Sequence, residues 1–168
     1  MRKLLLFALL LTTSCFAQDR VQDLAKAIAK AEGFYRVGTL PNRLHNPGDI
    51  RAHASHYPGQ VGLYKNYVVF KNDAYGWDAL EHQLSKIIDG TSRYTVNVTL
   101  EQLGKRYASS KLWARNVAHN LGVPLDTTLW EILGVAPVLE GVQCPSLNVV
   151  LQVVSTSVPT STMAGSTA

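Results

Sequence analysis

Glu32 is the residue whose type and position point most directly to chemistry. It follows Val21, Ala25 and Ile28 at spacings of three and four residues, which places all of them on one face of a helix. The three apolar residues predict that this face is buried, and Gly33 predicts that the helix ends there. Burial and the negative end of the helix dipole both disfavour a charged carboxylate, so we expect the raised pKa that a general acid needs. The alternative is a glutamate in the last turn that simply points to solvent.

A second cluster of polar residues follows between residues 42 and 51. The sequence Asn46-Pro47-Gly48 predicts a tight turn. This turn presents the side chains of Asn46 and Asp49 from a rigid loop, where both are placed to hydrogen-bond a polar ligand. The structural alternative is an Asx-turn, in which the two side chains satisfy only nearby backbone groups.

Short helices and one small hairpin must position these residues. The first helix is expected over residues 18–32, and residues 36–60 are rich in turn-forming residues, as is typical of a functional loop. A β-hairpin follows, with strands at 61–64 and 67–70. Further helices are expected from Asp73 to Gly90, Thr99 to Tyr107, Ser110 to Gly122 and Thr128 to Gly134. The expected fold class is therefore mainly α (α+β).

Capping signals define the boundaries of these helices. The segments 99–102 and 128–131 each have the form of a capping box. Asp73 is the expected N-cap of the longest helix, and Gly122 is the expected stop of the helix that Ser110 precedes. Leu112 is expected to face inward on that helix.

Length and composition indicate one domain of ordinary size with a real core. Apolar residues make up 46% of the 168 residues, and the formal net charge is +4. This mild basic excess suits an acidic polymer such as a cell wall without requiring one. The sequence holds no dense cluster of Lys and Arg, so nucleic acid is not an expected partner.

Residues 1–17 have the pattern of a secretory signal peptide. Arg2-Lys3 supplies the positive start, and the apolar run from Leu4 to Leu11 is too short to span a bilayer. Cleavage is expected after Ala17, which would give a secreted or periplasmic protein with no stable membrane insertion. The less favoured alternative is a lipoprotein signal in which Cys15 is acylated.

The two ends of the chain differ in character from its middle. After cleavage Cys144 would be the only cysteine, so no internal disulfide is expected. Residues 18–135 form the expected domain, and residues 136–168 form a C-terminal extension. Beyond about residue 155 the extension is rich in Ser, Thr, Ala and Pro, which predicts flexibility.

A series of short motifs, taken in order, resembles a known family. The motifs are Glu32-Gly33-Phe34-Tyr35, Asn46-Pro47-Gly48-Asp49-Ile50-Arg51, Phe70 with Gly76-Trp77-Asp78-Ala79-Leu80, Tyr107-Ala108, and Trp113-Ala114 through Leu121-Gly122-Val123. Together they resemble the lysozyme-like superfamily, in particular bacterial and phage soluble lytic transglycosylases and goose-type lysozymes, over roughly residues 20 to 134. The resemblance implies a mostly helical lysozyme-like fold, with a cleft between a helical lobe and a small lobe that bears the hairpin.

The resemblance also implies a reaction. Glu32 would be the general acid on the glycosidic oxygen between N-acetylmuramic acid and N-acetylglucosamine in peptidoglycan, with the Asn-Pro-Gly turn lining the cleft beside it. A hydrolase needs a second carboxylate, about 5 Å away if it is a nucleophile; Asp49 is the first candidate, with Asp73 and Asp78 behind it. A lytic transglycosylase needs only Glu32, which protonates the leaving oxygen and then accepts the proton of the substrate's own 6-hydroxyl. The sequence supports Glu32 better than any second carboxylate and favours the transglycosylase.

Aromatic residues provide candidate contacts to the sugar. The resemblance suggests that Tyr107 matches a tyrosine that faces the acid in lytic transglycosylases; the alternative is a tyrosine at the edge of the core. Four tyrosines in or near the loop region are placed to stack on sugar rings, namely Tyr35, Tyr57, Tyr64 and Tyr67. The three tryptophans lie on apolar helix faces and are expected to pack in the core, namely Trp77, Trp113 and Trp130.

Neither a metal nor a cofactor is expected. His45, His53 and His56 lack the further ligands that would complete a zinc site. The expected partner is the glycan strand of peptidoglycan, and the protein is expected to be a monomer. The competing hypothesis is a non-catalytic module that binds a glycan or a protein on the same fold. The sequence favours the enzyme, because a binding module gains nothing from an apolar stripe that ends in a carboxylate.

Overall fold

The computed structural model describes residues 18–52, 56–108, 110 and 112–138, all of which belong to one compact unit. The predicted signal peptide, Cys144 and the predicted flexible tail lie outside the described residues, as does His53. Within the described part of the chain, no helix has the length and apolar character needed to cross a bilayer.

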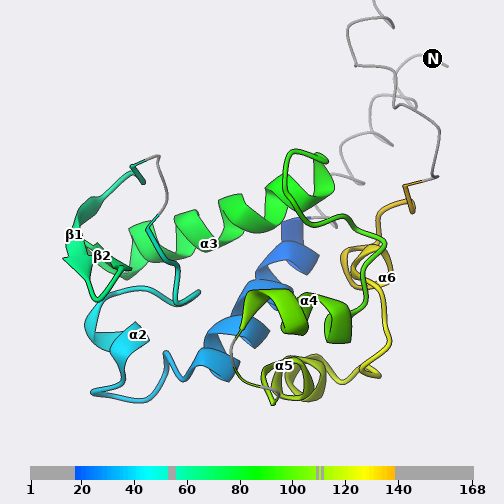
Figure 1. Ribbon diagram of the computed structural model, residues 1–168, viewed down its shortest axis with the longest axis horizontal. Coiled ribbons are helices and arrows are strands. Elements are labelled where there is room, and N and C mark those ends of the chain that lie inside the picture. The colour runs from blue at the N-terminus through cyan, green and yellow to red at the C-terminus, as the bar shows by residue number, and fades with distance from the viewer. Residues whose placement is uncertain (1–17, 53–55, 109, 111, 139–168) are drawn as a thin grey trace, which may run out of the picture. The chain divides into compact units, whose positions relative to one another are not determined.

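The described elements are helices and one two-stranded sheet (Figure 1). This confirms the mixed, mainly helical fold class. Residues 18–32 form the first of these helices, which we call the Glu32 helix. It is followed by α2 (Leu40–Arg43), β1 (Gln60–Tyr64), β2 (Tyr67–Phe70), α3 (Asp73–Ile88), α4 (Leu100–Tyr107), α5 (Trp113–Leu121) and α6 (Leu129–Leu133).

The hairpin forms where two short apolar runs on either side of Lys65-Asn66 predict it. Strands β1 and β2 pair antiparallel, with Tyr64 opposite Tyr67. Lys65 and Asn66 both adopt positive φ angles, 48° and 70°, which is the backbone of the tight turns that suit the twist of paired strands. On β2, Val68 and Phe70 are buried, so this strand fastens the hairpin to the core.

The capping signals are confirmed at most helix ends. Thr99 and Thr128 each form a complete capping box, and Gly122 ends α5 in the left-handed region. The expectation for Asp73 is wrong, because Asn72 is the N-cap of α3 and accepts a hydrogen bond from the Tyr75 amide. Asn72 is the residue just before the first helical turn, so its side chain reaches an unpaired amide of that turn. The Asp73 carboxylate pairs with His45 instead.

Two further expectations differ from the structure. The loop at 36–60 contains the short helix α2, which Pro41 begins at one of the first helical positions. Four residues are too few to show a helical period in the sequence. Leu112 is 57% exposed and does not face inward, because it is the N-cap of α5 and precedes the first helical turn.

The core is built around the Glu32 helix. Leu24, Ala25 and Ile28 are fully buried, and Val21 is 3% exposed, which confirms the predicted apolar face. Trp113 belongs to the same core, and the other two tryptophans, Trp77 and Trp130, pack against it. The core therefore packs against the same face of the Glu32 helix on which Glu32 itself lies.

The loop after α2 is fastened to the core by Asn46. This side chain is fully buried, its amide donates to the carbonyls of Ile50 and Val68 at 2.9 Å each, and its oxygen accepts from the Ile50 amide at 2.8 Å. Gly76 lets α3 approach the same loop, because a Cβ there would lie 2.0 Å from the His45 carbonyl oxygen. These contacts fix the backbone that leads into Asp49.

Replacing Asn46 with alanine should lower the free energy of unfolding by about 3 kcal/mol, because three hydrogen bonds are lost and buried backbone groups are left unpaired. Chemical denaturation of the wild type and the variant measures this loss. Asn116→Ala is the matched control, since Asn116 is exposed on α5, and it should change stability by less than about 0.5 kcal/mol. Equal stability of Asn46→Ala and the wild type would contradict a structural role for the amide.

Candidate active site

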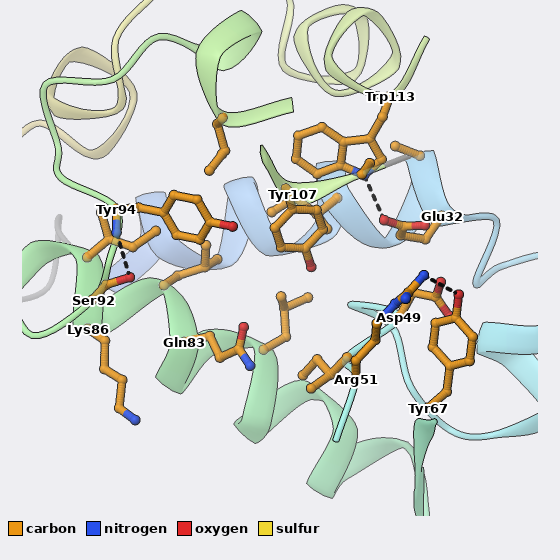
Figure 2. Close-up of a pocket in the computed structure, with 18 of the residues that line it drawn as sticks. Glu32, Asp49, Arg51, Tyr67, Gln83, Lys86, Ser92, Tyr94, Tyr107 and Trp113 are labelled. Carbon is orange, nitrogen blue, oxygen red and sulfur yellow. Dashed lines mark hydrogen bonds between the residues drawn. The ribbon is translucent and has the colours of Figure 1, made fainter. Parts of the chain in front are cut away.

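A cavity of about 830 Å³ opens beside the end of the Glu32 helix. Its walls come from that helix, from the loop at 49–52, from the start of β2, from α3 and from the facing ends of α4 and α5 (Figure 2). Glu32 and Asp49 are its two carboxylates among the described residues. Segments far apart in the sequence therefore meet around one acidic pair.

Glu32 is held at the end of its helix by a specific backbone motif. Gly33 has a φ of 82°, its amide donates to the Lys30 carbonyl, and the Phe34 amide donates to the Ala29 carbonyl at 2.9 Å. This pattern is a Schellman motif, in which a left-handed glycine ends the helix. The Glu32 side chain consequently projects from the last turn into the cavity.

The electrostatic environment of Glu32 matches that of a general acid. Burial, and next the negative charge of Asp49, raise the pKa of Glu32 from 4.5 to about 7. A hydrogen bond from the Trp113 indole N–H to Oε1, 2.7 Å long, acts in the opposite direction. Glu32 is therefore a protonated acid at mildly acidic pH and loses its proton near neutrality.

Asp49 lies beside Glu32 in an unusual conformation. Its φ is 48°, in the left-handed region that aspartate and asparagine tolerate better than most residues. Its Oδ1 atom is buried and has no hydrogen-bond partner among the described residues. Burial raises the pKa of Asp49, while the positive charge of Arg51 lowers it. Asp49 thus places an unpaired acceptor next to the acid.

Arg51 and Tyr67 form a cationic wall next to Asp49. The Arg51 guanidinium lies 5.0 Å from the centroid of the Tyr67 ring, and its Nη2 atom donates to the Tyr67 hydroxyl at 3.0 Å (Figure 2). Stacking and the hydrogen bond restrict the guanidinium to this wall. The cavity therefore combines two acidic groups with a fixed positive charge.

Tyr107 lies on the opposite wall and is directed at backbone. Its hydroxyl donates to the Gly48 carbonyl at 2.7 Å, and its ring stacks on Trp113 with centroids 4.7 Å apart. Burial raises the pKa of this hydroxyl, so it stays protonated. Tyr107 lines the cavity that holds Glu32, but its hydroxyl holds the turn that precedes Asp49.

The structure brings some of the predicted site residues together and separates others. Glu32, Asp49 and Tyr107 line one cavity, and Tyr57 and Tyr67 line it with them. The prediction that the Asn46 side chain binds a ligand is wrong, because that side chain is fully buried and its amide bonds the local backbone.

Two other predicted contacts lie elsewhere. Tyr35 is 56% exposed and packs beside Trp77, and Tyr64 is 39% exposed with the Arg43 guanidinium over its ring. Neither tyrosine lines the cavity that holds Glu32.

The alternative second carboxylates are also placed. Asp73 pairs with His45 at 2.6 Å on the surface, and Asp78 is exposed on α3. Neither lines the cavity, so Asp49 is the described carboxylate that accompanies Glu32. The described residues contain no group of three or more possible metal ligands.

Trp113 and Arg51 are the site residues that the sequence reasoning missed. Trp113 was expected to be a core residue, and it is 3% exposed, but its indole N–H also bonds the acid. The available signal was that a buried tryptophan needs a hydrogen-bond acceptor. Arg51 ends the motif at residues 46–51, and a positive charge two residues after Asp49 was the signal that could have identified it as a site residue.

Comparisons with known proteins give no information about the function of this chain. No protein-family model, no curated protein and no solved structure matched the chain. The arrangement of Glu32, Asp49 and Trp113 therefore carries the case for a function.

The raised pKa of Glu32 predicts how stability depends on pH. Between the ordinary pKa of 4.5 and about 7, the folded protein binds a proton that the unfolded chain releases, so stability falls as pH rises through this window. At pH 8 the Glu32→Gln variant should be more stable than the wild type by up to about 3 kcal/mol, whereas at pH 4 the two should be equal. Denaturation of both proteins at several pH values measures this difference. A difference that does not change with pH would contradict the raised pKa.

Proposed function

We propose that this protein is an exported peptidoglycan-cleaving enzyme with a lysozyme-like fold, and that it breaks the glycosidic bond between N-acetylmuramic acid and N-acetylglucosamine. The observation that carries the proposal is Glu32, a half-buried carboxyl group with a pKa of about 7 in an open cavity. Helices and a small hairpin around that cavity, together with the resemblance of the motifs, support the choice of fold and substrate.

Glu32 performs the first step by general acid catalysis. Its proton moves to the glycosidic oxygen as the bond from that oxygen to the anomeric carbon breaks, so the leaving sugar departs as a neutral alcohol. The resulting Glu32 carboxylate keeps the hydrogen bond from the Trp113 indole. Because the carboxyl group must be protonated at the start, activity should fall as pH rises through about 7.

For the second step we favour the lytic transglycosylase mechanism. The Glu32 carboxylate accepts the proton of the substrate's own 6-hydroxyl, whose oxygen bonds to the anomeric carbon and closes an anhydro ring. A group that first donates and then accepts a proton works best with a pKa near the operating pH, as Glu32 has. No second carboxylate and no metal is needed for this sequence of steps.

Hydrolysis is the second candidate, and the unpaired oxygen of Asp49 favours it. An ionised Asp49 beside the cleavage site is placed to activate a water molecule or to act as a nucleophile. Atoms of water would then appear in the product, which would carry an ordinary reducing end. The identity of the product therefore distinguishes the two mechanisms.

Glu32→Gln should reduce the release of soluble fragments from purified peptidoglycan by about 1000-fold, because an amide cannot donate a proton to the leaving oxygen. Mass spectrometry of the fragments identifies anhydro-muropeptides, which indicate the transglycosylase, or reducing-end muropeptides, which indicate the hydrolase. Glu101→Gln makes the same change at an exposed position on α4 and should leave the rate unchanged.

Two results would contradict the proposal. Equal rates for the wild type and Glu32→Gln would remove Glu32 from the chemistry. Absence of fragments from both proteins, with both still sedimenting with peptidoglycan, would instead support the non-catalytic binding module.

Asp49→Asn separates the two mechanisms further. Asparagine tolerates the left-handed backbone at this position, so the variant should fold. A transglycosylase should retain activity, and the pH at which activity falls should decrease because a negative charge that raises the pKa of Glu32 is gone. A hydrolase that uses Asp49 should lose about 100-fold or more in rate. Rates measured from pH 4 to pH 8 distinguish these outcomes.

A further inference from the structure

Two stacked aromatic side chains connect the segments that carry both carboxylates. Tyr107 ends α4, Trp113 begins α5, and their rings lie 4.7 Å apart at an angle of 29°. One ring donates a hydrogen bond to Glu32, and the other donates to the residue before Asp49. Figure 2 shows the Trp113 ring above Glu32 and the Tyr107 ring beside it.

Trp113 restrains the Glu32 carboxyl group directly. The indole is rigid, Trp113 is 3% exposed, and its Nε1 atom lies 2.7 Å from Oε1. An indole nitrogen can donate but cannot accept a hydrogen bond. Oε1 is therefore the accepting oxygen of Glu32 whether the carboxyl group is neutral or charged, and the acidic proton of the neutral form is left for Oε2.

Tyr107 restrains the Asp49 side of the site through the backbone. Its hydroxyl donates to the Gly48 carbonyl at 2.7 Å. Gly48 is packed so closely against α3 that a Cβ would lie 2.8 Å from the Leu80 side chain. Gly48 is thus held from two sides, and Asp49 follows it with a φ of 48°. Movement of Tyr107 would move the backbone from which the Asp49 side chain projects.

We propose that the stacked Tyr107–Trp113 pair is a positioning device that fixes the two carboxylates relative to each other and keeps the acidic proton of Glu32 on Oε2. The proposal rests on the proposed function and adds to it two residues that act through Glu32 and Asp49. The stacking matters because the two rings are in contact, so a displacement of one ring changes the packing of the ring that makes the other hydrogen bond.

Loss of the indole N–H should change how Glu32 titrates. This hydrogen bond favours the charged carboxylate and opposes burial and Asp49, so removing it should raise the pKa further. Among the described residues, the other charged groups that line the cavity are Asp49 and Arg51 from the loop, Lys86 from α3 and Arg93 from the segment after it. A phenylalanine at position 113 leaves all of these in place.

Trp113→Phe tests the proposal because it keeps an aromatic ring for stacking and removes only the N–H donor. The high-pH limb of the activity profile should move up by about half a pH unit or more, and kcat should fall by about 10-fold because the carboxyl group can rotate. KM should change little. Trp130→Phe, on α6 and outside the cavity, is the matched control and should alter neither quantity.

Tyr107→Phe tests the other half of the device. It keeps the stacked ring but removes the hydroxyl that donates to the Gly48 carbonyl. We expect kcat to fall, and the high-pH limb of the activity profile to shift less than in Trp113→Phe. The double variant should lose less than the product of the two single losses, because the rings act as a unit. An unchanged pH limb and kcat in a folded Trp113→Phe variant would overturn the proposal, as would independent effects of the two substitutions.

A measurement on the wild-type protein keeps the test valid if Trp113→Phe does not fold. The indole N–H resonance of Trp113 in a ¹⁵N-labelled sample should shift with pH, with a midpoint of about 7, and this titration should disappear in Glu32→Gln. The indoles of Trp77 and Trp130 serve as internal references. A Trp113 resonance that does not titrate would overturn the proposal. Because this readout needs no substrate, a titrating indole in a protein that cleaves nothing would reject the proposed function and leave the Trp113–Glu32 contact established.

Discussion

The site depends on a half-buried carboxyl group that forms no ion pair with a positively charged side chain among the described residues. Glu32 ends a helix face whose apolar residues are buried, and within the described part of the chain its side chain accepts a hydrogen bond from a neutral indole. Burial and the neighbouring Asp49 raise its pKa to about 7. A lysine or arginine in contact with Glu32 would stabilise the fold at neutral pH, but it would also keep the carboxylate charged and remove the acid. Glu32 therefore lowers the free energy of unfolding near neutral pH, but it keeps a proton that it can donate.

The rest of the cavity wall is organised to hold Asp49 close to that group. Asn46 fastens the loop to β2, and Gly76 allows α3 to press against the same loop. Tyr107 then holds Gly48 from the side of α4. These contacts stabilise a backbone on which Asp49 adopts a left-handed conformation with one unpaired oxygen. Residual strain and unpaired polar atoms concentrate at functional sites, where the surrounding structure can support them.

Elements with strong local signals could be predicted from the sequence. The capping boxes at Thr99 and Thr128 and the glycine after α5 are confirmed, since each depends on residues within one helical turn. The prediction was wrong where two local signals competed, as for Asn72 and Asp73 at the start of α3. It also missed α2, because so short a helix is stabilised by its surroundings and shows no period of its own.

By itself, the sequence determined that a glutamate ends a buried helix face, because spacing and apolar character are local properties and Gly33 stops the helix there. Only the tertiary structure decided what surrounds that glutamate. Trp113 lies 81 residues away in the chain, and its contact with Glu32 depends on how α5 packs. Packing of the turn against its neighbours, β2 among them, decided that Asn46 turns into the protein while Asp49 lines the cavity. Residue types in a turn do not specify which side chain faces the core, because burial is settled by the segments that pack against the turn.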